Sequence, residues 1–189
     1  MGTAVLAVIV LTIVLMQFWP NISERLAQNA AVQTLGTRNY ARLIDLAHPA
    51  EIQLCGWTDK QTEGLFRDLE LSRTWRAETS EQLQIVREGT KRRHSVVPLN
   101  CEGCERMTLN LARQGNDWKV QLGALAYDAA LATHGIPEGN QKLVEAMREH
   151  DIECIVHGPR RLIATPDMLA EKPNDPDAAW QPITKPLPE

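Results

Sequence analysis

The residues whose types and spacing most directly suggest chemistry form two short motifs that contain cysteine and histidine. Cys101 and Cys104 enclose a Glu-Gly pair, and Cys154 and His157 repeat this spacing further along the chain. Three thiolates and one imidazole are a common ligand set for a tetrahedral structural zinc ion. The sequence therefore predicts a structural zinc site at Cys101, Cys104, Cys154 and His157. An ion held by four protein ligands has no open position for catalysis.

The first of these motifs also fits a disulfide across a tight hairpin. Strand-like runs flank Cys101 and Cys104, and Glu-Gly would form a two-residue loop between them. Directly opposed residues in a hairpin have Cα atoms about 4.5–5.5 Å apart, which is within disulfide range. Disulfides persist outside the cytoplasm, whereas zinc thiolates are commoner inside it. Four unlinked thiols are a third alternative, and Cys55 belongs to neither site.

The sequence predicts no catalytic residues and no cofactor other than the zinc alternative. A thioredoxin-type redox cysteine requires a helix N-terminus to lower its pKa, whereas Cys101 follows a strand-like run. Asp45 and His48 are close in sequence, but His48-Pro49 is typical of a helix end. These residues therefore do not identify a reaction.

Composition narrows the class of protein further. The chain has 189 residues, of which 43% are hydrophobic and 23% charged, which excludes a disordered chain, a collagen and a disulfide knot. It carries 20 basic and 24 acidic residues without a long basic stripe. Nucleic acid is therefore not an expected partner.

The N-terminal residues predict a membrane anchor. No charged side chain precedes Glu24, and the run up to Trp19 is almost entirely apolar. As a helix, residues 2–19 would extend about 27 Å, close to the roughly 30 Å thickness of a hydrocarbon core. No small-residue cleavage site follows, which favours a retained single-pass anchor over a cleaved signal peptide.

The predicted localisation is accordingly the membrane, with two opposing indications for orientation. Arg25, Arg38 and Arg42 follow the apolar run, and the positive-inside rule would place the domain in the cytoplasm. N-terminally anchored bacterial domains are most often exported, and on that ground we predict the extracytoplasmic side.

The remaining chain divides at a change in hydrophobic period. Residues 21–70 show helical spacing, with breaks at Gly36 and His48-Pro49. After Leu71 apolar residues recur at every second position, and turn residues separate these strand-like runs. The pattern predicts antiparallel strands connected by hairpins. The predicted domains are an anchor over residues 1–20, an α+β domain over 21–123, a small helix-hairpin unit over 124–170 and a Pro-rich extended tail over 171–189.

The last two segments depend on contacts with something larger. The helix-hairpin unit is too small to hold a core alone, so it should dock on the first domain or on a partner. The tail holds five prolines, each of which lacks a backbone donor. We expect it either to be solvated or to lie extended on a partner, with Trp180 and Leu187 as the anchoring side chains.

The order of the elements resembles the cone-shaped α+β superfamily of ketosteroid isomerase and the nuclear transport factors. Asn39–Pro49 and Gly115–Val120 carry the resemblance, which covers roughly residues 30–122. It implies helices packed on a curved antiparallel sheet. Members include enzymes, ligand carriers, dimerisation modules and membrane-anchored domains, so the fold alone names no function. The acid–base groups of the family's enzymes have no residue-by-residue match here.

These observations favour a non-enzymatic, membrane-anchored accessory or assembly subunit of a larger membrane protein complex, with other protein subunits as partners. Two alternatives stay open: a domain that holds an apolar small molecule in the cone, and an enzyme of the isomerase or dehydratase type. An open pocket with convergent polar groups would favour the alternatives. A packed cone with an exposed apolar patch would favour the accessory role.

Overall fold

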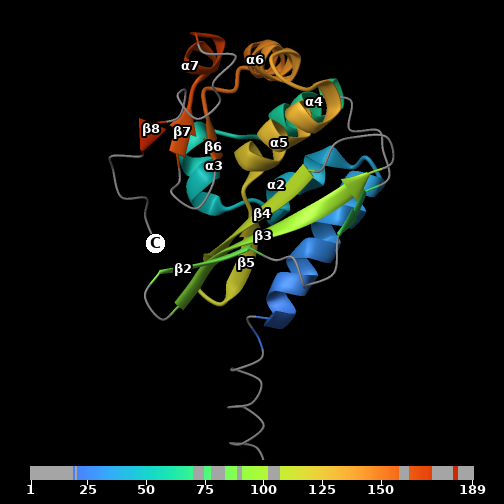
Figure 1. Ribbon diagram of the computed structural model, residues 1–189, viewed down its shortest axis with the longest axis vertical. Coiled ribbons are helices and arrows are strands. Elements are labelled where there is room, and N and C mark those ends of the chain that lie inside the picture. The colour runs from blue at the N-terminus through green and yellow to red at the C-terminus, as the bar shows by residue number, and fades with distance from the viewer. Residues whose placement is uncertain are drawn as a thin grey trace, which may run out of the picture.

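The structure is a computed structural model with an α+β architecture, which confirms that part of the predicted fold class. Figure 1 shows the main antiparallel sheet with the N-terminal helix beside it, helices α4–α6 above it, and a small sheet next to α3 and α7. The structure describes residues 19, 21–69, 75–77, 84–88, 91–101, 107–157, 162–171 and 181–182.

The structure corrects the predicted fold class at the N-terminus. Among the residues just given, no helix is both long and apolar enough to cross a membrane. The predicted transmembrane helix over residues 1–20 falls, apart from Trp19, outside them. The helix described at this end, residues 21–36, contains Glu24 and Arg25 and packs one side on the sheet. The single-pass anchor and the membrane localisation are therefore withdrawn.

The helices begin and end where local sequence signals place them. Thr58 and Gln61 form a capping box at the start of α4. His48-Pro49, predicted as a helix end, also starts a helix that the sequence analysis missed: His48 Nδ1 accepts a hydrogen bond from the Ala50 N–H at 3.3 Å, and Pro49 occupies the first helical position. The helices after residues 21–36 are η1 (Tyr40–Arg42), α2 (Leu43–Leu46), α3 (Pro49–Cys55), α4 (Asp59–Asp68), α5 (Leu122–His134), α6 (Glu138–Glu149) and α7 (Pro166–Glu171).

The main sheet is antiparallel throughout its described pairings, as the change of period predicted. Its order is β1-β3-β4-β5, and β2 pairs with the same strand β3 that β1 pairs with. Residues at alternate positions of β4 face opposite sides. Met107, Leu109 and Leu111 enter the hydrophobic core. The strands are β1 (Trp75–Ala77), β2 (Gln84–Glu88), β3 (Lys91–Cys101), β4 (Met107–Gln114) and β5 (Asp117–Val120).

A second, three-stranded sheet is built from β6 (Ile155–His157), β7 (Leu162–Ala164) and β8 (Gln181–Pro182). The first two strands form the predicted hairpin. The third comes from the Pro-rich tail, which was expected to be solvated or to lie extended on a partner. Gln181 and Pro182 pair with Ile163 and Leu162. A tail without periodicity can add to the edge of an existing strand, because the neighbouring strand supplies the register.

The element that joins the two sheets is α5, which the sequence did not indicate as a separate packed helix. Nine of its residues are buried, because small Ala and Gly side chains allow close contact on several sides. It packs against β4, β6 and α6. The hydrophobic core is one continuous cluster, and the helix at residues 21–36, the main sheet, α5 and α6 all contribute side chains to it.

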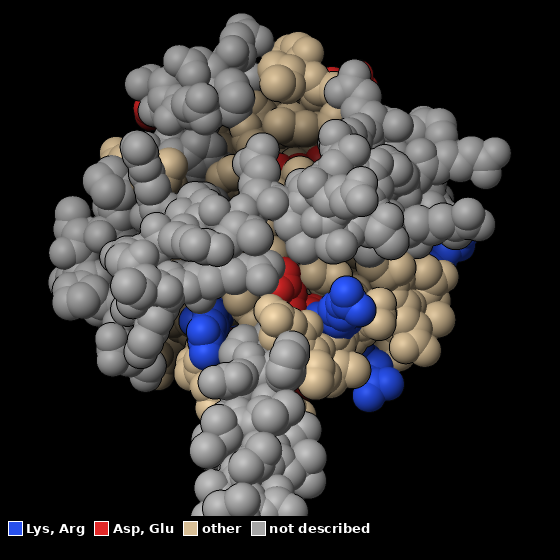
Figure 2. All heavy atoms as spheres, turned by 60° about the horizontal axis from the view of Figure 1, so that its bottom comes forward, with Lys and Arg blue, Asp and Glu red and all other residues tan. Residues whose placement is uncertain are grey.

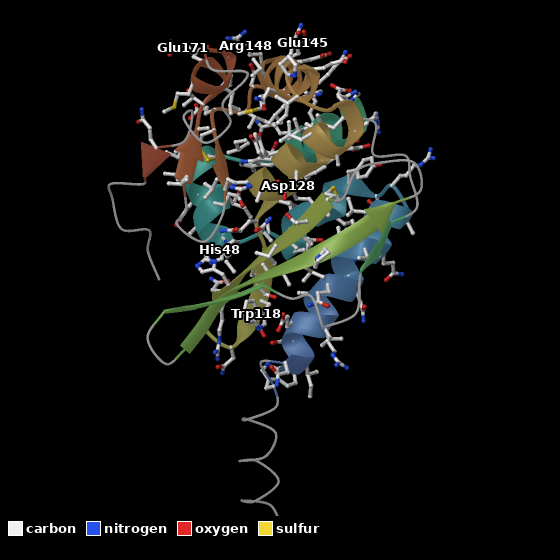
Figure 3. All side chains as sticks on the ribbon, viewed as in Figure 1. His48, Trp118, Asp128, Glu145, Arg148 and Glu171 are labelled. Carbon is white, nitrogen blue, oxygen red and sulfur yellow. A yellow bond between two sulfur atoms is a disulfide. The ribbon has the colours of Figure 1, made fainter. Side chains whose placement is uncertain are left out.

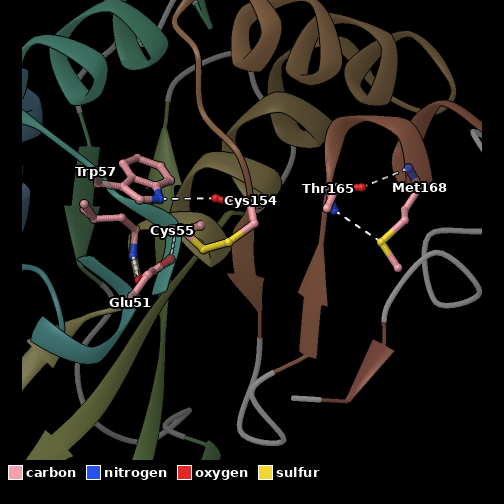
Figure 4. Close-up of a disulfide and its surroundings, with 8 residues drawn as sticks. Glu51, Cys55, Trp57, Cys154, Thr165 and Met168 are labelled. Atoms are coloured by element: carbon pink, nitrogen blue, oxygen red, sulfur yellow. Dashed lines mark hydrogen bonds between the residues drawn. A yellow bond between two sulfur atoms is a disulfide. The ribbon is translucent and has the colours of Figure 1, made fainter. Parts of the chain in front are cut away.

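A disulfide fastens the end of α3 to the residue that precedes β6 in the second sheet. Cys55 and Cys154 are bonded, with Cα atoms 5.1 Å apart and a sequence separation of 99 (Figure 4). The indole N–H of Trp57 donates to the Cys154 carbonyl at 3.2 Å, and both cysteines are buried. The covalent and polar links therefore hold the same two segments together.

We predict that the double variant Cys55→Ser/Cys154→Ser loses about 3–5 kcal/mol of unfolding free energy, because the bond closes a long loop in the unfolded chain. Urea unfolding followed by fluorescence would measure this, and reduction of the wild type should reproduce it. An unchanged midpoint would contradict the prediction. The parallel variant Cys101→Ser/Cys104→Ser tests the separate expectation that those two thiols are paired.

Gly123 allows α5 to approach β6 closely. A Cβ at Gly123 would lie 2.4 Å from the Val156 backbone nitrogen and 2.7 Å from the Ile155 Cβ. We predict that Gly123→Ala costs about 3 kcal/mol, because backbone rather than a flexible side chain must move. Gly36→Ala is the matched control, since nothing lies within 4 Å of its added Cβ. Equal thermal midpoints for the two variants would refute the close approach.

Candidate functional site

A group of polar side chains surrounds Asp128 on α5. Thr108 donates its hydroxyl to Asp128 Oδ2, and Asn110 Nδ2 donates to the same oxygen at 3.3 Å. The other carboxylate oxygen, Oδ1, lies 3.5 Å from His157 Nε2. Asp128 and His157 side chains are 18% and 29% exposed, so solvent reaches this group. We call these four residues, Thr108, Asn110, Asp128 and His157, the Asp128 cluster.

Three separate elements bring the cluster together. Thr108 and Asn110 alternate with the core-facing residues of β4 and therefore project from the opposite side of the strand. Asp128 comes from the middle of α5, and Figure 3 places it where that helix meets the strands. His157 is the last residue of β6, and its ring meets the Tyr127 ring edge-on with centroids 5.2 Å apart.

The order of these groups limits their chemistry. In a Ser–His–Asp triad the imidazole lies between the hydroxyl and the carboxylate. Here the carboxylate lies between the Thr108 hydroxyl and the imidazole of His157. The arrangement directs one oxygen of Asp128 toward His157. It suits a binding site better than a site that activates a nucleophile.

The structure gives two of the predicted zinc ligands, Cys154 and His157, separate partners. His157 belongs to the Asp128 cluster, but Cys154 is bonded to Cys55, so its sulfur offers no thiolate. Cys55, which was left outside both predicted sites, is its partner because α3 ends beside the segment that leads into β6. Among the described residues, no group of three or more His, Cys, Asp and Glu side chains could hold a metal ion.

The remaining predicted residues are only partly described. Cys101 ends β3, while Cys104 lies outside the described residues. β3 and β4 pair Leu99 with Met107, whereas a two-residue loop between the cysteines would pair Leu99 with Arg106. The strand register is thus offset by one residue from that hairpin, and the pairing of the two thiols stays a prediction. Trp180 and Leu187 also lie outside the described residues.

Asp128, Thr108 and Asn110 were not predicted from the sequence as site residues. The alternation Thr-Leu-Asn-Leu in β4 does show that Thr108 and Asn110 share a side of the strand. Nothing in the sequence near Asp128 indicates that it would face them, because α5 was not recognised as a packed helix. His48, the other histidine considered earlier, caps α3 and lies apart from Asp128 (Figure 3).

Glu51 of α3 is a buried acid whose contacts are structural. Its Oε2 accepts from the Leu122 N–H at 2.8 Å and its Oε1 from the Gly123 N–H at 2.6 Å. These groups begin α5, whose N-cap residue Gln121 makes no side-chain cap. Burial raises the pKa of Glu51 to about 7, although backbone hydrogen bonds from Gly123, Leu122 and Val156 act to lower it.

Comparison with known proteins identifies no relative. No family model, curated protein or solved structure matches the chain. The resemblance to the ketosteroid-isomerase and nuclear-transport-factor superfamily is not tested by these comparisons and stays a prediction.

The raised pKa of Glu51 predicts how stability depends on pH. The folded state holds the proton more tightly than the unfolded chain, in which the carboxyl has its ordinary value of 4.5. The contribution of this group is therefore fully present below pH 4.5 and is lost as the pH rises through about 7, by roughly 3 kcal/mol in total.

Urea unfolding of the wild type and Glu51→Gln across this range would measure the effect. We expect the wild type to lose stability relative to Glu51→Gln as the pH rises, because Gln stays neutral. Glu145→Gln, at a side chain that is 55% exposed, is the control and should keep the wild-type profile. A difference that grows in the opposite direction would show that the backbone donors outweigh burial.

Proposed function

We propose that this chain is a non-enzymatic accessory or assembly protein that binds another protein through its N-terminal helix. The observation that carries the proposal is an exposed apolar stripe of Trp19, Ile22 and Leu26, which are 44%, 43% and 57% exposed. They are three of the four large hydrophobic side chains exposed in the described part of the chain. Contiguous apolar surface of this kind is typical of interaction sites.

The helix is held so that this stripe faces outward. Its other side buries Ala27, Ala31 and Leu35 in the core. Buried Glu24 accepts a hydrogen bond from the Ser95 hydroxyl of β3 at 2.6 Å, and Ser23 donates to the Asn116 carbonyl at 3.0 Å. Rotation of the helix to bury the stripe would break both bonds and leave a buried carboxylate without Ser95.

The spacing of the stripe favours a helix as the occupant. Trp19, Ile22 and Leu26 are separated by three and four residues, the pattern that packs against a second helix. The stripe ends at the exposed polar residues Asn29 and Gln33, so the contact covers about two turns. We therefore propose an amphipathic helix of a partner protein as the occupant.

The charge around the stripe indicates the character of that helix. Arg25 is exposed on the same two turns, and Figure 2 shows further Lys and Arg side chains around the end of the molecule from which this helix starts. Complementary potentials favour a partner with acidic residues beside its apolar stripe. The proposal thus specifies both the shape and the charge of the partner.

The interior supports a binding role rather than catalysis. In the part of the chain that the structure describes, two carboxylates are buried, and each is held by groups of the protein itself: Glu24 by Ser95, and Glu51 by the first N–H groups of α5. The inner side of the main sheet is covered by packed side chains, including Leu99, Met107 and Leu109, each with 0% exposure. These features support a packed scaffold that presents a surface.

We predict that Ile22→Glu/Leu26→Glu abolishes partner binding without unfolding the domain, because it places two charges in the apolar stripe. Asn29→Glu/Gln33→Glu is the matched control, with the same added charge on exposed positions of the same helix. The measurement is native mass analysis of the full chain isolated from its own cells, combined with chemical cross-linking.

The proposal expects a stoichiometric complex for the wild type and the control but not for the stripe variant. Cross-links from residues 21–36 should reach an amphipathic helix with acidic flanks. A complex that survives the stripe substitutions would overturn the proposal. Self-association through this helix, detected as a homo-oligomer by light scattering, would refute the choice of partner.

A further inference from the structure

The native disulfide encloses the other two cysteines of the chain. Cys55 and Cys154 are 99 residues apart in the sequence. Cys101 and Cys104 lie between them, and both are less than half as far from Cys55 along the chain as Cys154 is. These two thiols are also synthesised before Cys154, and folding proceeds from the N-terminal side during synthesis. The native bond is thus neither the nearest pairing of Cys55 nor the first that becomes possible.

Chain statistics favour the wrong partners for Cys55. The entropic cost of closing a flexible loop grows with the logarithm of its length, so a loop of half the length closes about three times as often. In the unfolded chain, Cys55 therefore meets Cys101 and Cys104 each about three times as often as it meets Cys154. Most of the first bonds that Cys55 makes are non-native for this reason.

Only tertiary structure brings the native pair together. The loop that the bond closes contains α4, the whole main sheet and α5. Cys55 ends α3, and Cys154 precedes β6. The two meet beside Glu51, whose carboxylate accepts the first N–H groups of α5 (Figure 4). These contacts form when α5 has docked, so the fold favours the native pair late, after the shorter loops have had time to close.

A bond between Cys55 and Cys101 would prevent this fold. Cys101 is the last residue of β3 and pairs with Trp75 of β1. Figure 1 shows the tip of the β3 arrow and α3 on opposite sides of the molecule. In the finished fold, Cys55 and Cys154 are 2% and 5% exposed, so an external thiol does not reach them. A wrong bond must therefore be exchanged before the core closes.

We propose that this chain is a substrate of a thiol–disulfide isomerase, which frees Cys55 from a wrong partner so that it can pair with Cys154. In the first bond, two thiols lose two electrons and two protons to oxidised glutathione, which becomes two glutathione thiols. The isomerase thiolate then attacks the Cys55 sulfur, the wrong S–S bond breaks, and the Cys101 or Cys104 thiolate leaves. The Cys154 thiolate attacks the same sulfur and releases the isomerase thiolate, so this exchange is redox neutral.

Oxidation of the full chain tests the first part of the proposal. The reduced chain is diluted from urea into oxidised glutathione, and samples are alkylated at intervals and mapped by mass spectrometry. We expect bonds from Cys55 to Cys101 and Cys104 first, and the native bond only after minutes to hours. The matched control, Cys101→Ser/Cys104→Ser, has no wrong partner within the chain and should form the native bond about tenfold faster.

A second stage isolates the exchange from the oxidation. The oxidant is removed from the wrongly paired wild-type chains, and a catalytic amount of reduced thiol–disulfide isomerase is added. We expect the Cys55–Cys154 bond to appear about tenfold faster than without the enzyme. The number of disulfides per chain should stay constant, because the exchange neither adds nor removes electrons.

The proposal fails if Cys154 is the first partner of Cys55 in the wild type, or if Cys101 and Cys104 pair with each other before Cys55 has reacted. It also fails if the wild type and the control form the native bond at equal rates. Wrongly paired chains that correct themselves equally fast without the enzyme would overturn it as well. Should the control not fold, the map of wild-type bonds and the second stage still decide the question, because neither uses a variant.

Discussion

The buried carboxylate of Glu51 is the interaction on which the arrangement of the elements depends. Its two oxygens accept the Leu122 and Gly123 N–H groups at the start of α5, where the local sequence offers no side-chain cap. The structure therefore uses a residue from α3 to satisfy donors of a helix about seventy residues later.

The same junction is reinforced by contacts of other kinds. The disulfide between Cys55 and Cys154 and the hydrogen bond from Trp57 to the Cys154 carbonyl join the end of α3 to the approach to β6 (Figure 4). Gly123 allows the backbones of α5 and β6 to come close. Covalent, polar and steric constraints thus determine one position for α5, and that position places Asp128 between β4 and β6.

The outer surface follows from a different constraint. Glu24 and Ser95 fix the rotation of residues 21–36 on the main sheet, so the small residues Ala27 and Ala31 face the core. The large apolar residues at the beginning of this helix are then left outside. This helix is apolar on two sides. One side is buried in the core of the domain, and the other is available to a partner.

The sequence by itself determined the elements whose signals are local. Helical spacing before residue 70 and alternating spacing after it predicted helices in the first segment and antiparallel strands in the second. It could not determine α5, because a helix buried on several sides has no polar face and therefore no amphipathic period. Nor did it recognise α3, since His48-Pro49 signals both a helix end and a helix start.

Only the tertiary structure decided which distant residues meet. The sequence grouped Cys154 with nearby His157 and with the Cys101 motif, but the pairing of cysteines depends on how α3 docks beside β6 and not on spacing. The Asp128 cluster likewise combines a strand, a helix and a second strand, and no motif joins them. Helix and strand propensity depends on neighbouring residues and can be read from the sequence. These long-range contacts form only after the core has brought the elements together.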